Sequence, residues 1–144
     1  MSWGLGDTVV IPQESEPAKW LRDHLRTWLT PKFPSLTGYA VGMQPSGWNP
    51  DEDAPYLAVF DDSGPMKWPV ETRPTLRVVV WSDSLTLSRD IAGYALGQTL
   101  SRKVDGFATV LPGTRVLDAR DTNNSGIMAS YTVRTRVRTL VPEA

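Results

Sequence analysis

The chain has 144 residues, with 15 lysine and arginine residues against 16 aspartate and glutamate residues, one histidine and no cysteine. That length is typical of one domain that buries its own core, and the near-neutral charge singles out neither a polyanion nor a membrane as a partner. The lack of cysteine excludes disulfide scaffolds, cysteine-based zinc sites and thiol nucleophiles.

Residues 1–14 predict an N-terminal arm ahead of one domain at residues 15–144. The arm contains Trp3 and a short apolar run at residues 9–11, which needs a surface to lie on. The arm lacks the basic segment and long apolar run of a signal peptide, and no later stretch is long enough to span a membrane, so we expect a cytoplasmic protein. An amphipathic helix follows, from Ser15 or Glu16 to Thr30, because apolar residues recur there at helical spacing.

Three strands are predicted next, at residues 36–44, 56–60 and 75–81. A long loop rich in turn residues joins the first two, and a second long loop leads to the third. The third strand has apolar residues on both faces, which indicates a central position in the sheet.

The second helix is predicted to begin at Asp83 or Ser84 and to continue to about Val104, with Gly106 placed to stop it. Its apolar residues fall on two faces at 100° per residue. One face contains Leu87, Ile91, Tyr94 and Ala95. The nearly opposite face contains Leu85, Ala92, Leu96 and Leu100.

A sheet covers only one of these two helix faces, so the face with Leu96 needs either the first helix or another subunit. We take this second face as a candidate oligomer interface. Gly93 and Gly97 each cost about 1 kcal/mol relative to alanine, which indicates a close backbone approach along the helix.

The chain closes with a predicted hairpin of strands at residues 114–119 and 128–141, joined by a polar loop. Side chains alternate along a strand, so Arg134, Arg136 and Arg138 share one face and span about 13 Å. They could meet phosphates or the carboxylates of another subunit. Alternatively, they form a solvated face paired with acids of the neighbouring strand, such as Asp118, and discourage edge-to-edge aggregation.

The order α-β-β-β-α-β-β predicts an α+β fold, with two helices packed on one face of a mainly antiparallel sheet. No nucleophile motif, phosphate-binding glycine loop or calcium-loop pattern is present, and the single histidine, His24, excludes a histidine metal cluster. We therefore expect no enzyme activity, no cofactor and no metal site. Trp3, Trp48 and Trp68 lie in the arm and the two long loops, either as anchors for a protein partner or as plugs over the sheet ends.

The early helix, the segment RPTLRVVVWSDSLTLSRDIAGYALGQTL, the loop DTNNSG and the closing strand ASYTVRTRVRTLV together resemble tail terminator proteins of long-tailed, siphovirus-type phages, particularly those of actinobacterial hosts. The resemblance covers about Pro17 to Val141. It implies a structural virion protein, made in the host cytoplasm and located in the tail or neck. Members of the family form a ring, commonly a hexamer, that caps the tail tube and stops its polymerisation.

The partners that this resemblance implies are further copies of the chain, the major tail tube protein and the head-tail connector, while genomic DNA passes through the ring without specific binding. Tight binding of phosphates would resist the exit of DNA. We therefore expect at least two of the three arginines to pair, within the subunit or across the ring interface, with carboxylates such as Asp118, Asp121 or the Asp51–Asp53 group. The alternatives are a neck or head-closure protein of the same kind of particle, and a small nucleic-acid-binding module that uses the arginines.

Overall fold

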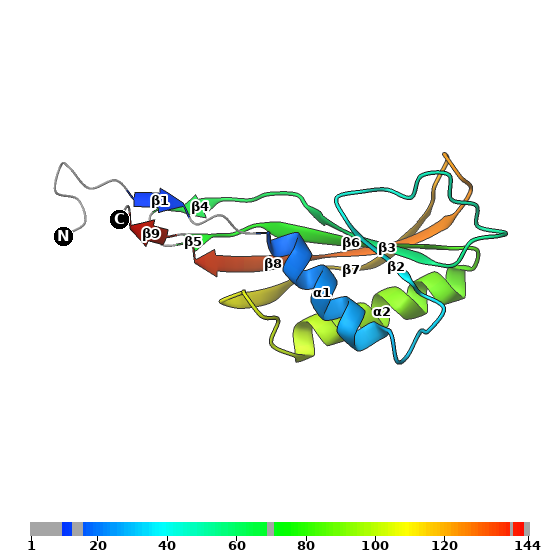
Figure 1. Ribbon diagram of the computed structural model, residues 1–144, viewed down its shortest axis with the longest axis horizontal. Helices are drawn as coiled ribbons and strands as arrows, with labels where there is room; N and C mark the ends of the chain where they lie inside the picture. Colours follow the sequence, from blue (N-terminus) through cyan, green and yellow to red (C-terminus); the bar gives the residue numbers. More distant parts are fainter. Residues whose placement is uncertain (1–9, 13–15, 69–70, 139, 143–144) are drawn as a thin grey trace.

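The computed structural model describes residues 10–12, 16–68, 71–138 and 140–142. Its helices are α1 (Pro17–Leu29) and α2 (Leu85–Ser101). Its strands are β1 (Val10–Pro12), β2 (Gly38–Val41), β3 (Tyr56–Asp61), β4 (Met66–Lys67), β5 (Glu71–Thr72), β6 (Thr75–Ser82), β7 (Thr109–Arg120), β8 (Ile127–Arg138) and β9 (Leu140–Pro142). Both helices lie on the same side of the main sheet (Figure 1), which confirms the predicted α+β class.

The main sheet has seven strands, and β6 is central because it pairs with β3 on one edge and with β8 on the other. The predicted closing hairpin is confirmed, since β7 pairs antiparallel with β8. One pairing in this mainly antiparallel sheet is parallel: β2 runs parallel to β3, and residues 42–55 connect them without a helix. That connection is the long loop that contains Trp48.

Strands β5 and β6 extend a single register along β8. Glu71 lies opposite Arg138 and Thr75 lies opposite Arg134, so both sides advance by the same four residues. The run is interrupted at Pro74, which has no N–H to donate, although its carbonyl accepts from the N–H of Thr135 at 3.1 Å. This continuity brings Glu71 and Thr72 beside the end of β8.

Residues 10–12 of the N-terminal arm pair with residues near the C-terminal end of the chain. Strand β1 pairs antiparallel with β9 in a separate two-stranded sheet, with Val10 opposite Pro142. In Figure 1 this sheet lies at the end of the molecule that also carries β4 and β5. Trp3 lies outside the described residues.

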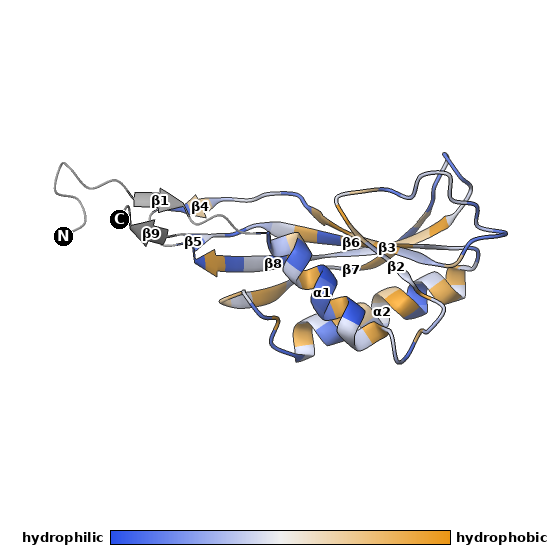
Figure 2. Cartoon of the chain, in the orientation of Figure 1, coloured by the Kyte–Doolittle hydropathy of each residue, from blue (hydrophilic) through white to orange (hydrophobic). Residues whose placement is uncertain are grey.

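Helix α1 buries the face that its sequence pattern predicted. Pro17 occupies the first turn, where a missing N–H costs nothing, and the helix ends at Leu29. Ala18, Leu21, Leu25 and Leu29 are buried and join the main core between the helices and the sheet. Figure 2 shows apolar and polar segments alternating along both helices, as expected for helices that each bury one side.

Helix α2 has one buried face rather than the two that were predicted. Its buried residues are Ser88, Ile91, Ala92, Ala95 and Thr99. At 100° per residue these lie within one continuous arc, between the two predicted faces. The polar Ser88 and Thr99 lie inside that arc. Because they interrupt the apolar residues of the buried face, the sequence pattern shows two apolar faces instead of one.

Both polar side chains are satisfied where they are buried. Ser88 Oγ donates to the carbonyl of Ile127 at 2.8 Å, and Thr99 Oγ1 donates to the carbonyl of Ala95 at 2.8 Å. Their burial therefore carries little penalty.

Several element boundaries also differ from the prediction, and the strand predicted at residues 128–141 is divided into β8 of the main sheet and β9 of a separate sheet. Helix α2 begins after the predicted Ser84 cap, whose side chain accepts from the N–H of Leu87, but it ends at Ser101 rather than near Val104. Gly106, with a φ of +98°, lies in the turn that follows, where an added Cβ would meet the Trp20 ring at 2.6 Å. Strand β7 begins at Thr109, and its register shifts after Pro112, because an edge strand tolerates a proline at a bulge.

The face of the sheet opposite the helices carries a second, smaller cluster. Ala58, Val79 and Trp81 are buried there, and Trp48 packs against them from the 42–55 loop. This loop therefore covers the half of that face which lies away from the arginines of β8.

Candidate interaction surface

The four residues of the candidate oligomer interface on α2 differ in burial: some are part of the core and others are exposed. Ala92 is 0% exposed and belongs to the main core, so it lies beneath the surface of the subunit. Leu96 is half-buried and packs against the same core. Leu85 and Leu100 stay open, with 37% and 40% of their surface exposed. The remaining apolar surface of this flank is thus at the two ends of α2.

The predicted close approach at Gly93 and Gly97 is absent among the described residues, because a Cβ added at either position would meet no atom within 4 Å. Beside Gly93 a cleft of about 490 Å³ separates α2 from β7. Its lining includes Leu117, exposed on β7, and the ion pair between Arg89 and Asp118. The open flank of α2 and the edge strand β7 therefore form one continuous side of the molecule.

The three arginines of β8 share one face, as predicted, and point away from the helices. Arg134, Arg136 and Arg138 are exposed, whereas Tyr131, Val133 and Val137, at odd-numbered positions of the same strand, are buried on the helix side. Arg134 donates through Nε to the carbonyl of Pro112 at 3.2 Å. Arg136 lies 3.8 Å from the carboxylate of Glu71.

Two of the acids predicted as partners for these arginines, Asp118 and Asp121, are engaged elsewhere within the subunit. Asp118 lies opposite Ala129, on the helix face of the sheet, where it pairs with Arg89 of α2. Asp121 is 8% exposed and accepts from the Trp81 indole N–H at 2.9 Å. Strand alternation explains the first case, because residues at odd and even positions of β8 face opposite sides.

The acid that does lie beside the arginines of β8 is Glu71, which was not predicted from the sequence. Glu71 accepts from Nε of Arg73 at 2.6 Å and also lies beside Arg136. The hydrogen bond from Arg73 lowers the pKa of the Glu71 carboxyl, helped by the charges of Arg73, Arg136 and Lys67. Lys67, Arg73 and Glu71 come from a segment that only strand pairing brings to β8, so no local pattern pointed to them.

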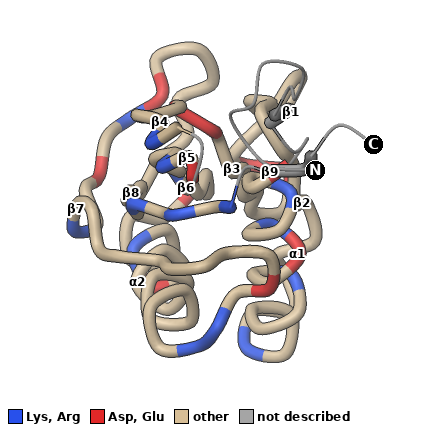
Figure 3. The backbone as a smooth tube through the Cα atoms, turned by 90° about the vertical axis from the view of Figure 1, so that its left-hand side faces the viewer, with Lys and Arg blue, Asp and Glu red and all other residues tan. Residues whose placement is uncertain are grey.

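These residues form what we call the basic end of the molecule: Lys67, Arg73, Arg134, Arg136 and Arg138. Figure 3 looks onto this end and shows lysine and arginine gathered around β4, β5 and β8. Glu71 is the single acid placed among them by the described strand pairings. The cluster therefore retains a strong net positive charge.

The loop tryptophans have different environments. Trp48 is half-buried, donates its indole N–H to the carbonyl of Ala54 at 2.8 Å, and lies so near Gly126 that an added Cβ would meet its ring at 2.5 Å. Trp48 thus covers the end of the sheet. Trp68 is 52% exposed beside β4 and remains available to a partner.

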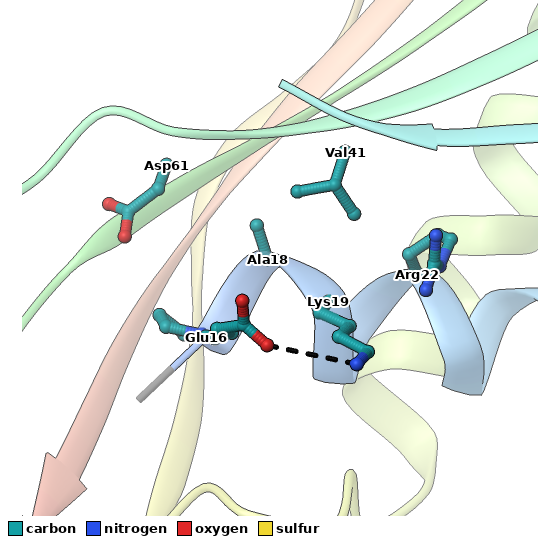
Figure 4. A pocket seen from close by; sticks show the side chains of 7 residues that line it. Glu16, Ala18, Lys19, Arg22, Val41 and Asp61 are labelled. Carbon is teal, nitrogen blue, oxygen red and sulfur yellow. Dashed lines mark ion pairs between the residues drawn. The ribbon is translucent and has the colours of Figure 1, made fainter. Parts of the chain in front are cut away.

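A further cavity lies beside the first turn of α1. The cavity of about 420 Å³ in Figure 4 lies between the first turn of α1 and Val41 and Asp61, and the ion pair between Glu16 and Lys19 runs along its helix side. His24 donates through Nε2 to the carbonyl of Gln98 and so ties α1 to α2. Among the described residues no three His, Cys, Asp or Glu side chains are grouped as metal ligands.

Tyr131 lies in the core between the sheet and α2, and burial raises the pKa of its hydroxyl above the ordinary value near 10. The folded chain favours the neutral Tyr131 hydroxyl, and this contribution to stability is complete below about pH 10, where the tyrosine of the unfolded chain is also neutral. The contribution is lost as the pH rises further and the unfolded chain ionises. We expect urea unfolding of Tyr131→Phe to show about 1 kcal/mol less stability at pH 7 and a weaker loss between pH 9 and 11. The exposed Tyr94→Phe is the matched control and should keep the alkaline loss of the parent chain; an identical loss in Tyr131→Phe would contradict the assignment.

No helix in the described ranges is long and apolar enough to cross a membrane. No protein-family model matches the sequence, and no curated protein matches it. Among solved structures, the gp17 protein of bacteriophage SPP1 has a similar fold, with a TM-score of 0.50 and 19% sequence identity. The match covers 83% of this chain and 86% of gp17, so the two proteins share a fold over most of their lengths.

Proposed function

We propose that this chain is a structural virion protein of a long-tailed bacteriophage and acts as its tail terminator. In this role a ring of subunits caps the tail tube, ends its polymerisation and joins the tail to the head connector. The role is structural and not enzymatic. The observation that carries the proposal is the fold shared with a bacteriophage protein over 83% of the chain.

The surface of the subunit supports a role in assembly. The open flank of α2 with Leu85 and Leu100, the edge strand β7 with Leu117, and Trp68 beside β4 each present large apolar side chains to solvent. Such side chains, particularly tryptophan, often anchor contacts between proteins. We assign the flank of α2 to the contact between subunits and Trp68 to a neighbouring virion protein.

The proposal is tested by adding the purified chain to tail tube protein during polymerisation. We expect rings of one size in negative-stain images, tubes that stop growing, and a ring at one tube end. Binding to the head connector without any effect on the tubes would favour a neck protein instead. Tubes that grow unchanged, with no ring at either end, would contradict the tail terminator role.

Leu100→Glu should abolish ring formation and tube capping, because it places a charge on the open flank of α2, while the monomer remains folded. Ser101→Glu is the matched control, since it adds the same charge one residue further on at an exposed position, and it should assemble normally. Circular dichroism and sedimentation velocity measure folding and assembly in the same samples. Rings of unchanged stability in Leu100→Glu would remove this flank from the interface.

A further inference from the structure

The molecule carries opposite charges at its two ends. The basic end is defined above. At the other end lies the acidic loop, formed by Asp51, Glu52 and Asp53 within the 42–55 connection (Figure 1). No lysine or arginine occurs between residues 33 and 66 of the sequence, so the acidic loop has no cation near it along the chain. Arg120, which strand pairing places at this end opposite Ile127, donates to the carbonyl of Ser125 at 3.2 Å and pairs with none of the three acids.

The acidic loop is held in place rather than left free. Trp48 anchors it on the sheet, as described above. Within the loop, the Asp53 carboxylate accepts from the N–H of Asn49 at 2.6 Å, and the Asn49 side chain accepts from the N–H of Asp51 at 2.9 Å. Asp51 and Glu52 are exposed, and no described cation pairs with either. The turn therefore presents two carboxylates to solvent in a defined conformation.

The two ends cannot meet within one subunit. Trp48 contacts Gly126, at the start of β8, whereas Arg136 lies ten residues further along that strand. At about 3.3 Å per residue this separation is roughly 30 Å, well beyond the screening length of about 10 Å at 0.1 M salt. A partner for either end must therefore come from outside the subunit.

The basic end has a recess that suits a carboxylate. A pocket of about 200 Å³ is lined by Pro65, Arg73, Thr75, Leu111, Arg134, Thr135 and Arg136. Three guanidinium groups reach it, and the nearby Glu71 carboxylate is already shared between Arg73 and Arg136. Arg134 uses its Nε on a backbone carbonyl, and its planar fork keeps further donors for a carboxylate.

We propose that the basic end of one copy receives the acidic loop of a neighbouring copy of this chain in a head-to-tail contact. Asp118 and Asp121, two of the predicted partners of the arginines, bind Arg89 and Trp81 within the subunit. The acidic loop is the remaining predicted partner. A contact between two different surfaces of identical subunits forms a ring when its rotation closes. This inference rests on the proposed function, because it adds an ionic contact between subunits of the ring to the apolar contact assigned to the flank of α2.

The test reverses the charges on each side separately. The first variant is Arg134→Glu with Arg136→Glu, and the second is Asp51→Lys with Glu52→Lys; Asp53 is kept because it holds the loop. Each variant alone should weaken self-association at 0.1 M salt by at least about tenfold, measured by sedimentation velocity. All four substitutions in one chain restore the complementarity and should restore assembly. Assembly of the parent chain should weaken as salt rises to 0.5 M.

The matched control is Lys19→Glu with Lys103→Glu, which reverses two exposed cations away from the basic end and should assemble like the parent chain. Circular dichroism shows whether each variant is folded. Rings that persist in the first two variants, or a folded fourfold variant that stays monomeric, would overturn the contact but leave the proposed function standing. The parent chain could retard DNA at low salt while the Arg134→Glu, Arg136→Glu variant does not, although its rings form. That outcome would assign the basic end to nucleic-acid binding. A parent chain that forms no ring, with or without tail tube protein, would contradict both proposals.

Discussion

Trp81→Ala is expected to lower the free energy of unfolding by about 3–5 kcal/mol, the cost of removing a buried large aromatic side chain. Trp81 is 2% exposed, packs edge to face on Tyr56 with ring centroids 5.6 Å apart, and forms part of the cluster that holds Trp48. Its indole N–H also satisfies the nearly buried Asp121 carboxylate. The midpoint of thermal unfolding should fall by about 10–20 °C.

The control for Trp81 is Trp28→Ala on α1. Trp28 is 37% exposed, and the guanidinium of Arg102 lies over its ring, 3.6 Å from the centroid. An exposed cation–π contact contributes about 0.5–1 kcal/mol, so this variant should lose far less stability. Trp81→Phe keeps most of the ring volume and isolates the loss of the hydrogen bond to Asp121. If urea unfolding shows equal losses of stability for Trp81→Ala and Trp28→Ala, the cluster on the sheet face opposite the helices does not contribute the stability assigned to it.

Ala92→Glu is expected to cost about 3–5 kcal/mol and to leave little folded protein, because it places an unpaired carboxylate in the main core. The neighbouring Gly93→Glu is the matched control, with the same added charge one residue away. A Cβ at Gly93 meets no described atom within 4 Å, and glycine inside a helix costs about 1 kcal/mol, so this variant should be as stable as the parent or slightly more stable. Urea unfolding of the two variants separates buried from open positions on α2.

The same pair of variants decides between core and interface for Ala92. A folded Ala92→Glu monomer that fails to assemble would return Ala92 to the contact between subunits. A chain that does not fold would place Ala92 in the core. Sedimentation velocity on any folded fraction provides the measurement.

The amino-acid sequence by itself determined what depends on neighbouring residues along the chain. Helical spacing located α1, the Ser84 cap located the start of α2, and strand alternation placed the three arginines of β8 on one face away from Val133. These features follow from the periods of the helix and the strand, which fix the direction of a side chain within its own element.

The tertiary structure alone decided what depends on which segments meet. Burial of the polar Ser88 and Thr99 on α2, possible because the carbonyls of Ile127 and Ala95 accept their hydroxyl groups, merged two predicted apolar faces into one. Strand pairing placed Glu71 beside Arg136 and turned Asp118 toward Arg89. The positions of the basic end and the acidic loop at opposite ends of the molecule also come from this pairing. Register and packing between distant segments are set by long-range contacts, and local periodicity carries no information about them.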